Sequence, residues 1–413
     1  MIPIYAVCAL SLFADEAFDP SANFRTIALG LDNFDGEKTD LVSQSLLRLI
    51  IDGRPTGELV YEIHGVQSLT SFSSDIGIGN PNSSFVASGN RFQALDARWD
   101  WHRGDETEAS FIVDRLNLRV SFPAIDITLG RQAISFGKAY FWNPLDVYLP
   151  FDPRQFDRDY KPGVDALRID VPIGDFTGLN LVAAAGGELA VTGEFLNEKS
   201  DFNSSWYGSS VLVRGYTTVS EWDLAVQTGK VYGGYQLGGA ASGEVGELSL
   251  RLEAAYLAAQ DSPALPFGLR GNLVEDHLQA VVGIGHRFES SLDLEAEYFF
   301  NGAGEDKDLN AALFRFNTGG ALNLGRHLAG ITASYEIMPI LIGRLVTLVS
   351  LTDQSTQIQP GFTLSVSDEA DFLIGASLNV GDRPRQGLGL LPEVRSEFGS
   401  QPNVLFMELK VYF

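Results

Sequence analysis

Hydrophobic and polar residues alternate with a period of two along most of the chain. In the segment ELSLRLEAAYL, Leu248, Leu250 and Leu252 share one face, whereas Arg251 and Glu253 share the other. Successive side chains of a β-strand point to opposite faces, so this period predicts strands with one apolar and one polar face. About 18 such runs occur, most of about 9–13 residues, and no long segment of helical period interrupts them. They begin near residues 42, 57, 91, 109, 125, 164, 178, 208, 221, 234, 247, 276, 290, 325, 342, 356, 370 and 403.

The composition of the polar face separates a membrane barrel from a soluble β-sandwich. A sandwich also alternates, but here arginine, aspartate and glutamate recur on the polar face over more strands than one sandwich holds. A transmembrane barrel needs apolar side chains toward lipid and polar side chains around water, and closure satisfies every backbone group. Short connections also alternate with long ones, as periplasmic turns alternate with outer loops. We predict an all-β protein, a single transmembrane antiparallel β-barrel of about 18 strands, with 16 as the alternative.

The C-terminal strand indicates the membrane. In LFMELKVYF, one face carries Leu405, Met407, Leu409, Val411 and the terminal Phe413. A final strand that ends in an aromatic residue resembles the assembly signal of bacterial outer-membrane barrels. It implies a bacterial outer-membrane location, the outer-membrane assembly machinery as a partner through this strand, and lipid and lipopolysaccharide as surroundings. Whether the barrel forms a homo-oligomer is left open.

The N-terminal residues divide into three parts. Residues 1–14 resemble a secretory signal peptide with cleavage after Ala14, although no Lys or Arg precedes the apolar core, and they contain the only cysteine, Cys8. Residues 15–41, which include NFRTIALGLD, form either an N-terminal extension or a first strand. The barrel is expected over residues 42–413. With this count, the long connection 69–90 falls at the wrong end of the barrel unless one strand is miscounted.

The strand that contains GRQ poses a problem of orientation. Ile127 and Leu129 face lipid, which would place Arg131 on the lipid face as well. An arginine near the middle of the membrane costs about 2–4 kcal/mol on that face. Because glycine within a strand often marks a bulge, we expect a one-residue slip at Gly130. The slip would turn three side chains inward, Arg131, Ala133 and Ser135, and two outward, Ile134 and Phe136. An inward basic patch would then comprise Arg115, Arg119, Arg131 and Arg168.

The loop 137–163 that follows is rich in rings and charges. It holds seven aromatic residues and four prolines, and aromatic rings need burial, whereas prolines make an irregular path rigid. We expect the loop to fold into the lumen, narrow the channel and form ion pairs with wall arginines. The alternative places the rings in an interfacial belt and the charges on a solvated rim. The candidate constriction residues are Tyr140, Trp142, Asp146, Asp152, Arg154, Asp157, Arg158 and Asp159.

These two segments also carry a resemblance. GRQAISFGKAYFWNPLDV followed by YKPGVDALRIDVP is similar to a family of large Gram-negative outer-membrane barrels, porin-like proteins and hydrophobic-substrate transporters with a Gly-Arg-Gln strand and an Asn-Pro-x-Asp loop. Alginate-export-type channels resemble it more distantly. The resemblance covers residues 109–185 well and the remainder only by its barrel pattern. It implies a passive channel or uptake porin and does not identify a solute.

The remaining composition narrows the function. The formal net charge of −24 argues against nucleic acid, whose binding requires lysine and arginine on phosphates. There is no CxxCH haem motif, the five histidines lack metal-ligand spacing, and we expect no cofactor and no enzyme activity. Inward acids are expected among the arginines, at Glu62, Asp126, Asp170, Glu253, Asp293, Glu295 and Glu297. We therefore predict a porin that passes small polar or substrate-class-specific solutes by diffusion. The alternative is a barrel that sheathes a cytochrome electron conduit.

Overall fold

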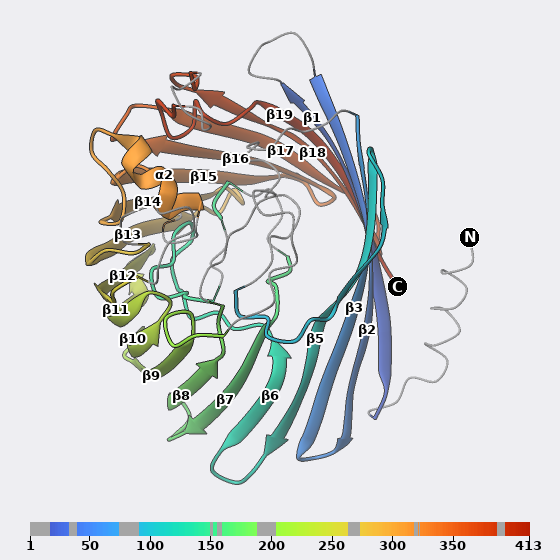
Figure 1. Cartoon of the computed structure of the whole chain (residues 1–413), viewed down its shortest axis with the longest axis vertical. Helices are drawn as coiled ribbons and strands as arrows, with labels where there is room; N and C mark the ends of the chain where they lie inside the picture. The colour runs from blue at the N-terminus through green and yellow to red at the C-terminus, as the bar shows by residue number, and fades with distance from the viewer. Residues whose placement is uncertain are drawn as a thin grey trace.

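The computed structural model describes residues 17–32, 39–73, 91–148, 152–154, 159–187, 204–262, 273–317, 321, 323–385 and 393–413. The described residues form one antiparallel sheet of 19 strands, of which 18 close into a ring because the first strand pairs with the last (Figure 1). The predicted signal peptide, residues 1–14, lies outside this description.

The wall strands in chain order are β1 (Asp19–Asp32), β2 (Thr39–Thr56), β3 (Leu59–Phe72), β5 (Thr107–Ser121), β6 (Asp126–Gln132), β7 (Val164–Pro172), β8 (Thr177–Ala184), β9 (Ser210–Val219), β10 (Trp222–Val231), β11 (Gly234–Val245), β12 (Leu248–Ala259), β13 (His277–Arg287), β14 (Asp293–Asn301), β15 (His327–Met338), β16 (Leu341–Ser350), β17 (Thr356–Ser367), β18 (Ala370–Val380) and β19 (Val404–Tyr412).

The two faces of the wall differ as the alternation predicts. On β12, Leu252 and Tyr256 are exposed on the outside, whereas Glu253 and Ala255 are buried on the inside. The same inversion recurs around the ring, and closure leaves no edge among the wall strands. Such an apolar outer belt around a polar interior is stable in lipid. The chain therefore has the fold of an outer-membrane β-barrel.

The count of 18 wall strands is confirmed, but the membership of the ring needs two corrections. Residues 15–41 were expected to form either an extension or a first strand, and the second alternative holds, because residues 24–32 belong to β1, which closes the ring against β19. The barrel therefore begins at Asp19 and not at residue 42. The run near residue 91 is not a wall strand. It contributes only β4 (Arg98–Arg103), which pairs with β5 alone, while β3 pairs directly with β5. Residues 73–106 are then a single connection, and every long connection lies at one rim, called here the long-loop rim.

Strand β6 leaves the wall early. Its pairing with β5 and β7 continues without a register shift to Arg131, so the predicted one-residue slip at Gly130 is wrong. Instead Gly130 adopts a φ of 116°, where an added Cβ would overlap the carbonyl oxygen of Leu116. Only glycine reaches such a conformation without strain. The backbone conformation of Gly130, and not a shift in strand pairing, therefore accommodates Arg131 in the strand.

After Gln132 the chain turns away from the wall. Residues 91–97 occupy the position between β5 and β7 that β6 has left. Backbone hydrogen bonds join this segment to β5 through the Ala97 carbonyl and to β7 through the Phe92 carbonyl. Ile134 and Phe136, which were expected to face lipid, are buried with Phe92 in an apolar cluster. That expectation fails because the strand ends before these residues.

One of the connections at the long-loop rim contains a helix. The helix α2 (Leu309–Asn317) lies in the connection between β14 and β15 at this rim (Figure 1). The described part of the chain includes no helix that is long and apolar enough to cross a membrane.

Candidate functional site

The connection between β6 and β7, residues 133–163, is called here the inner loop. Its first half, residues 133–148, lies along the inner face of the wall, and two wall glutamates bind its backbone. Glu253 on β12 accepts hydrogen bonds from the N–H groups of Lys138 (3.0 Å) and Leu145 (2.6 Å). Glu297 on β14 accepts them from the N–H groups of Tyr140 and Phe141, the latter at 2.7 Å. Both side chains are 3% exposed. Each carboxylate therefore binds two loop amides with its two oxygens.

Wall amides bind the carbonyl groups of the same loop. Gln227 donates to the Leu145 carbonyl and Gln236 donates to the Pro144 carbonyl, each at 3.0 Å. The wall residue beside Leu145 is Gly238 of β11, where an added Cβ would overlap the Leu145 side chain. Loop and wall approach closely because the wall has no side chain at this position.

The rings at the start of the loop are buried inside the barrel. Phe141 and Trp142 are 0% and 1% exposed, and Trp142 stacks on Phe299 of β14 with centroids 5.4 Å apart. The Trp142 indole donates to Asn323 at 3.0 Å. Arg344 donates to the Tyr140 hydroxyl at 2.7 Å. The alternative interpretation, an interfacial belt of these rings, is therefore wrong for Phe141 and Trp142.

The charged residues of the loop lie at several points around the interior. Asp146 binds the Lys161 ammonium at 2.5 Å and accepts a hydrogen bond from Ser135 at 2.8 Å. Burial raises the pKa of the Asp146 carboxyl and lowers the pKa of the Lys161 ammonium, because each charge loses its hydration. Arg115 of β5 donates to the Lys161 carbonyl. The Asp146–Lys161 ion pair therefore links the two ends of the loop.

The second half of the loop reaches the far wall. Asp152 pairs with Arg154 at 2.5 Å, and the Arg154 carbonyl accepts a hydrogen bond from Gln359 of β17 at 3.0 Å. Asp159 pairs with Lys410 of β19. Asp157 and Arg158, which the sequence also nominated, lie outside the described residues. The described part of the loop thus contacts widely separated strands of the ring, and its trace runs inside the ring in Figure 1.

The four predicted wall arginines do not form one basic patch. Arg131 is 2% exposed, and its guanidinium binds both carboxylate oxygens of Asp165, at 2.7 and 2.9 Å. It also donates to the carbonyls of Val113 and Leu95. Asp114 neutralises Arg115 at 2.9 Å. Two of the four arginines are therefore occupied by buried partners.

Arg119 and Arg168 face the lumen in one row. Arg119 on β5 and Arg168 on β7 both lie opposite Thr128 of the intervening β6. Arg168 pairs with Asp170 at 2.9 Å, whereas no hydrogen bond or ion pair connects Arg119 to another described residue. A further lumen arginine is Arg214 on β9. Its Nε atom is buried without a partner, as is that of Arg119.

Sequence reasoning named Glu253 and Glu297 as inward acids, but it missed their function as ligands of the loop backbone. It missed Gln227, Gln236 and Arg214 entirely. Alternation alone places these side chains on the inner face, which is a signal that could have nominated them. Nothing in the local sequence shows that a loop more than 80 residues away supplies the partner groups of Gln227.

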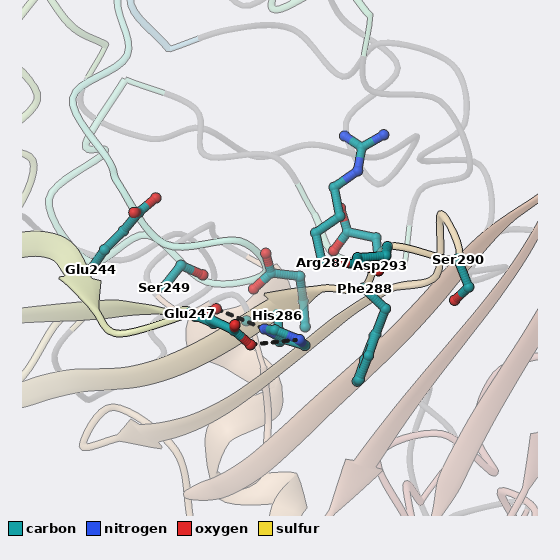
Figure 2. A pocket seen from close by; sticks show the side chains of 11 residues that line it. Glu244, Glu247, Ser249, His286, Arg287, Phe288, Ser290 and Asp293 are labelled. Atoms are coloured by element: carbon teal, nitrogen blue, oxygen red, sulfur yellow. Dashed lines mark hydrogen bonds and ion pairs between the residues drawn. The ribbon is translucent and has the colours of Figure 1, made fainter.

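A second stretch of the inner wall is acidic. At the rim of short turns, β11–β14 border a cavity of about 750 Å³, lined in part by Glu244, Ser249, Arg287, Asp293 and Glu295 (Figure 2). Figure 2 shows Glu244 and Arg287 on one side of the strands, with His286 and Phe288 on the other. In an outer-membrane barrel the short turns face the periplasm, so this cavity would open toward that side. Within the part of the chain that the structure describes, no group of His, Cys, Asp and Glu side chains is arranged to hold a metal ion.

The closed ring and its inner loop define a class of fold, the outer-membrane β-barrels of 18 strands. No protein-family model matches the chain, and no curated protein sequence matches it. Solved structures are similar in fold. OccAB1 of Acinetobacter baumannii superposes with a TM-score of 0.55 at 10% identity, over 97% of each chain. OpdQ of Pseudomonas aeruginosa gives 0.54 at 10% identity, over 97% of this chain and 99% of the other. OpdK of P. aeruginosa with vanillate gives 0.53 at 10% identity, over 96% and 98%. At 10% sequence identity, these three structures are similar to the chain in fold alone.

Proposed function

We propose that this protein is an outer-membrane channel for the passive diffusion of small polar solutes, and that the loop 137–163 narrows its lumen. The observation that carries the proposal is the position of Phe141 and Trp142, buried inside a closed ring of 18 strands. A barrel of this size leaves an aqueous passage unless loops fill it. A loop attached along the inner wall reduces that passage, and the charged residues beside it select solutes by size and field.

The lumen arginines favour small anions. Arg119 has no partner among the described residues, and the Nε atom of Arg214 has none either. An unpaired guanidinium in a partly buried setting is costly unless a solute or water satisfies it. The net charge of −24 counts every residue of the chain, whereas selectivity depends on the charges that line the passage. OpdK, which shares the fold, was solved with vanillate. The anion preference that we propose for this chain rests on its own lumen arginines.

The GRQ strand and the NPxD loop are proposed to mark a family of such barrels. Three observations support this. Gly130 takes a conformation open to glycine, Arg131 is enclosed with Asp165, and Asp146 of the NPxD sequence binds Lys161. The alternative function, a sheath around a cytochrome, is disfavoured because the inner loop occupies space that a cytochrome would need.

Conductance tests the channel and its constriction. Purified full-length protein in a planar bilayer should show stepwise conductance in potassium chloride. Deletion of residues 140–160 leaves enough chain to join β6 to β7, which are adjacent, and should raise the unit conductance about twofold or more. Folding of each barrel is checked by its heat-modifiable electrophoretic mobility. If neither protein conducts, the channel proposal is wrong; if both conduct equally, the constriction is wrong.

The reversal potential in a salt gradient tests the anion preference. Arg119→Gln removes the unpaired lumen charge and should shift the reversal potential toward cation selectivity. The matched control is Arg103→Gln, which removes an exposed arginine from β4, outside the ring. An equal shift in both variants, or none in either, would contradict a selective role for Arg119.

A further inference from the structure

The backbone of the inner loop depends on two carboxylates that are far from it in sequence. Glu253 and Glu297 lie on β12 and β14, which are separated in the sheet by β13. Four amides between residues 138 and 145 donate to them. These amides belong to an irregular segment, so the strand ladders do not provide acceptors for them.

The two carboxylates have no other strong partner. Among the residues described, no cation lies within ion-pair distance of either carboxylate. Arg251, the basic residue that acts on Glu297, is bound to Glu295. Charged neighbours of Glu253 are Asp146 in the loop, Glu297 on β14 and Arg214 on β9. Hydrogen bonds from amides to ionised carboxylates are about twice as strong as neutral ones. The loop backbone therefore supplies the hydrogen-bond donors of both glutamate side chains.

The surrounding wall is shaped for this contact. Gly283 lies beside Glu297, and a Cβ at Gly283 would crowd the Glu297 side chain at 2.9 Å. Gly330 leaves room for the Phe141 ring, which would lie 2.7 Å from an added Cβ. The glutamates and the glycines together define one docked position of residues 138–145.

We propose that Glu253 and Glu297 act as a latch, which holds the loop against the β12–β15 wall and so keeps the remaining passage open. Undocking of residues 138–145 would move this segment into the lumen and close the channel. The two glutamates are positioning residues, because they act on solute passage through the loop. This inference rests on the proposed channel function and adds a gate to it.

Single-channel recording of the full-length protein tests the latch. Glu253→Gln and Glu297→Gln keep the size of each side chain but replace one acceptor oxygen by an NH₂ group, which cannot accept from an amide. Each change should shorten the dwell time of the open state by about tenfold or more, since one charge-assisted hydrogen bond is lost per glutamate. The double variant should flicker more than either single variant.

Two further variants separate a latch from a general effect on charge or folding. Glu244→Gln removes the same charge from an exposed glutamate of β11 that lines the acidic cavity, and it should leave the dwell times unchanged. Gly330→Ala disturbs docking from the side of Phe141 without touching either carboxylate, and it should cause the same closures. Only inserted, folded barrels contribute to these recordings.

The outcomes distinguish the latch from the channel. Steady conductance in wild-type protein and flicker in the glutamate and Gly330 variants would support the latch. Steady conductance in every protein would overturn the latch and leave the channel intact. Absence of conductance in wild-type protein would overturn both.

Discussion

Removal of the Arg131 side chain should destabilise the barrel more than any exposed arginine would. In the native protein its guanidinium makes two hydrogen bonds to Asp165 and one each to the carbonyls of Val113 and Leu95. Arg131→Met leaves Asp165, whose side chain is 10% exposed, without its cation. Breaking a buried ion pair costs about 3–5 kcal/mol, and each orphaned carbonyl adds about 1 kcal/mol. We expect a loss of about 5 kcal/mol in the free energy of unfolding.

A second substitution separates the charge from the lost packing. Asp165→Leu removes the uncompensated carboxylate but also the acceptor of the Leu95 amide, so the double variant Arg131→Met/Asp165→Leu should recover about 2 kcal/mol of the loss. The remaining deficit of about 3 kcal/mol reflects the carbonyls of Val113 and Leu95 and the Leu95 amide, at about 1 kcal/mol each. The double variant is therefore expected to be more stable than the single variant.

Urea titration of the refolded protein in phosphocholine vesicles, followed by tryptophan fluorescence, measures these differences. Arg103→Met, on the exposed surface of β4, is the control and should change the free energy of unfolding by about 0.5 kcal/mol or less. A loss for Arg131→Met that is no larger than the loss for this control would contradict the prediction. A double variant that is no more stable than Arg131→Met would contradict it as well.

Three other perturbations have defined outcomes. Gly229→Ala should lower the free energy of unfolding by about 1–3 kcal/mol in the same urea titration, because φ is 145° and backbone atoms lie against the new Cβ. The control is Gly246→Ala, in a turn with free space, which should lower it by about 1 kcal/mol. Lys161→Met should destabilise the protein most at pH 8 and less at pH 5, because burial raises the pKa of Asp146 and protonation at lower pH removes the unpaired charge; equal losses at both pH values would contradict this. Deletion of Phe413 should lower the yield of folded barrel in cells and leave refolding in vesicles unchanged, as measured by heat-modifiable mobility.

The alternation of side chains identified the wall strands because lipid and water impose opposite requirements on the two faces of each strand. The alternation failed to separate the strands of the ring from a strand outside it, because both can show the same period of two. In β4, Trp99 and Trp101 alternate with Asp100 and His102 as they would in a wall strand, yet this strand pairs with β5 alone. Strand β1 has the same period and was left as an alternative. Pairing partners distinguish the two, and a single strand does not encode its partners.

The inner loop was predictable in kind and not in its contacts. Seven rings and four prolines indicated a buried, rigid path, and the burial of Phe141 and Trp142 agrees with this. Ion pairs to wall arginines were the expected anchors. The observed anchors include the carboxylates of Glu253 and Glu297 and the backbone of the loop, and a backbone amide is the same in every sequence context.

By itself the sequence determined that this protein is a transmembrane barrel of about 18 strands with a ring-rich loop after β6, because these properties follow from periodicity and local composition. The tertiary structure alone decided where the ring closes, how Arg131 is neutralised and which residues hold the loop. These depend on Asp165, Glu253 and Glu297, which are distant in sequence from the residues they contact. Closure of the barrel brings them together, so their functions exist only in the folded protein.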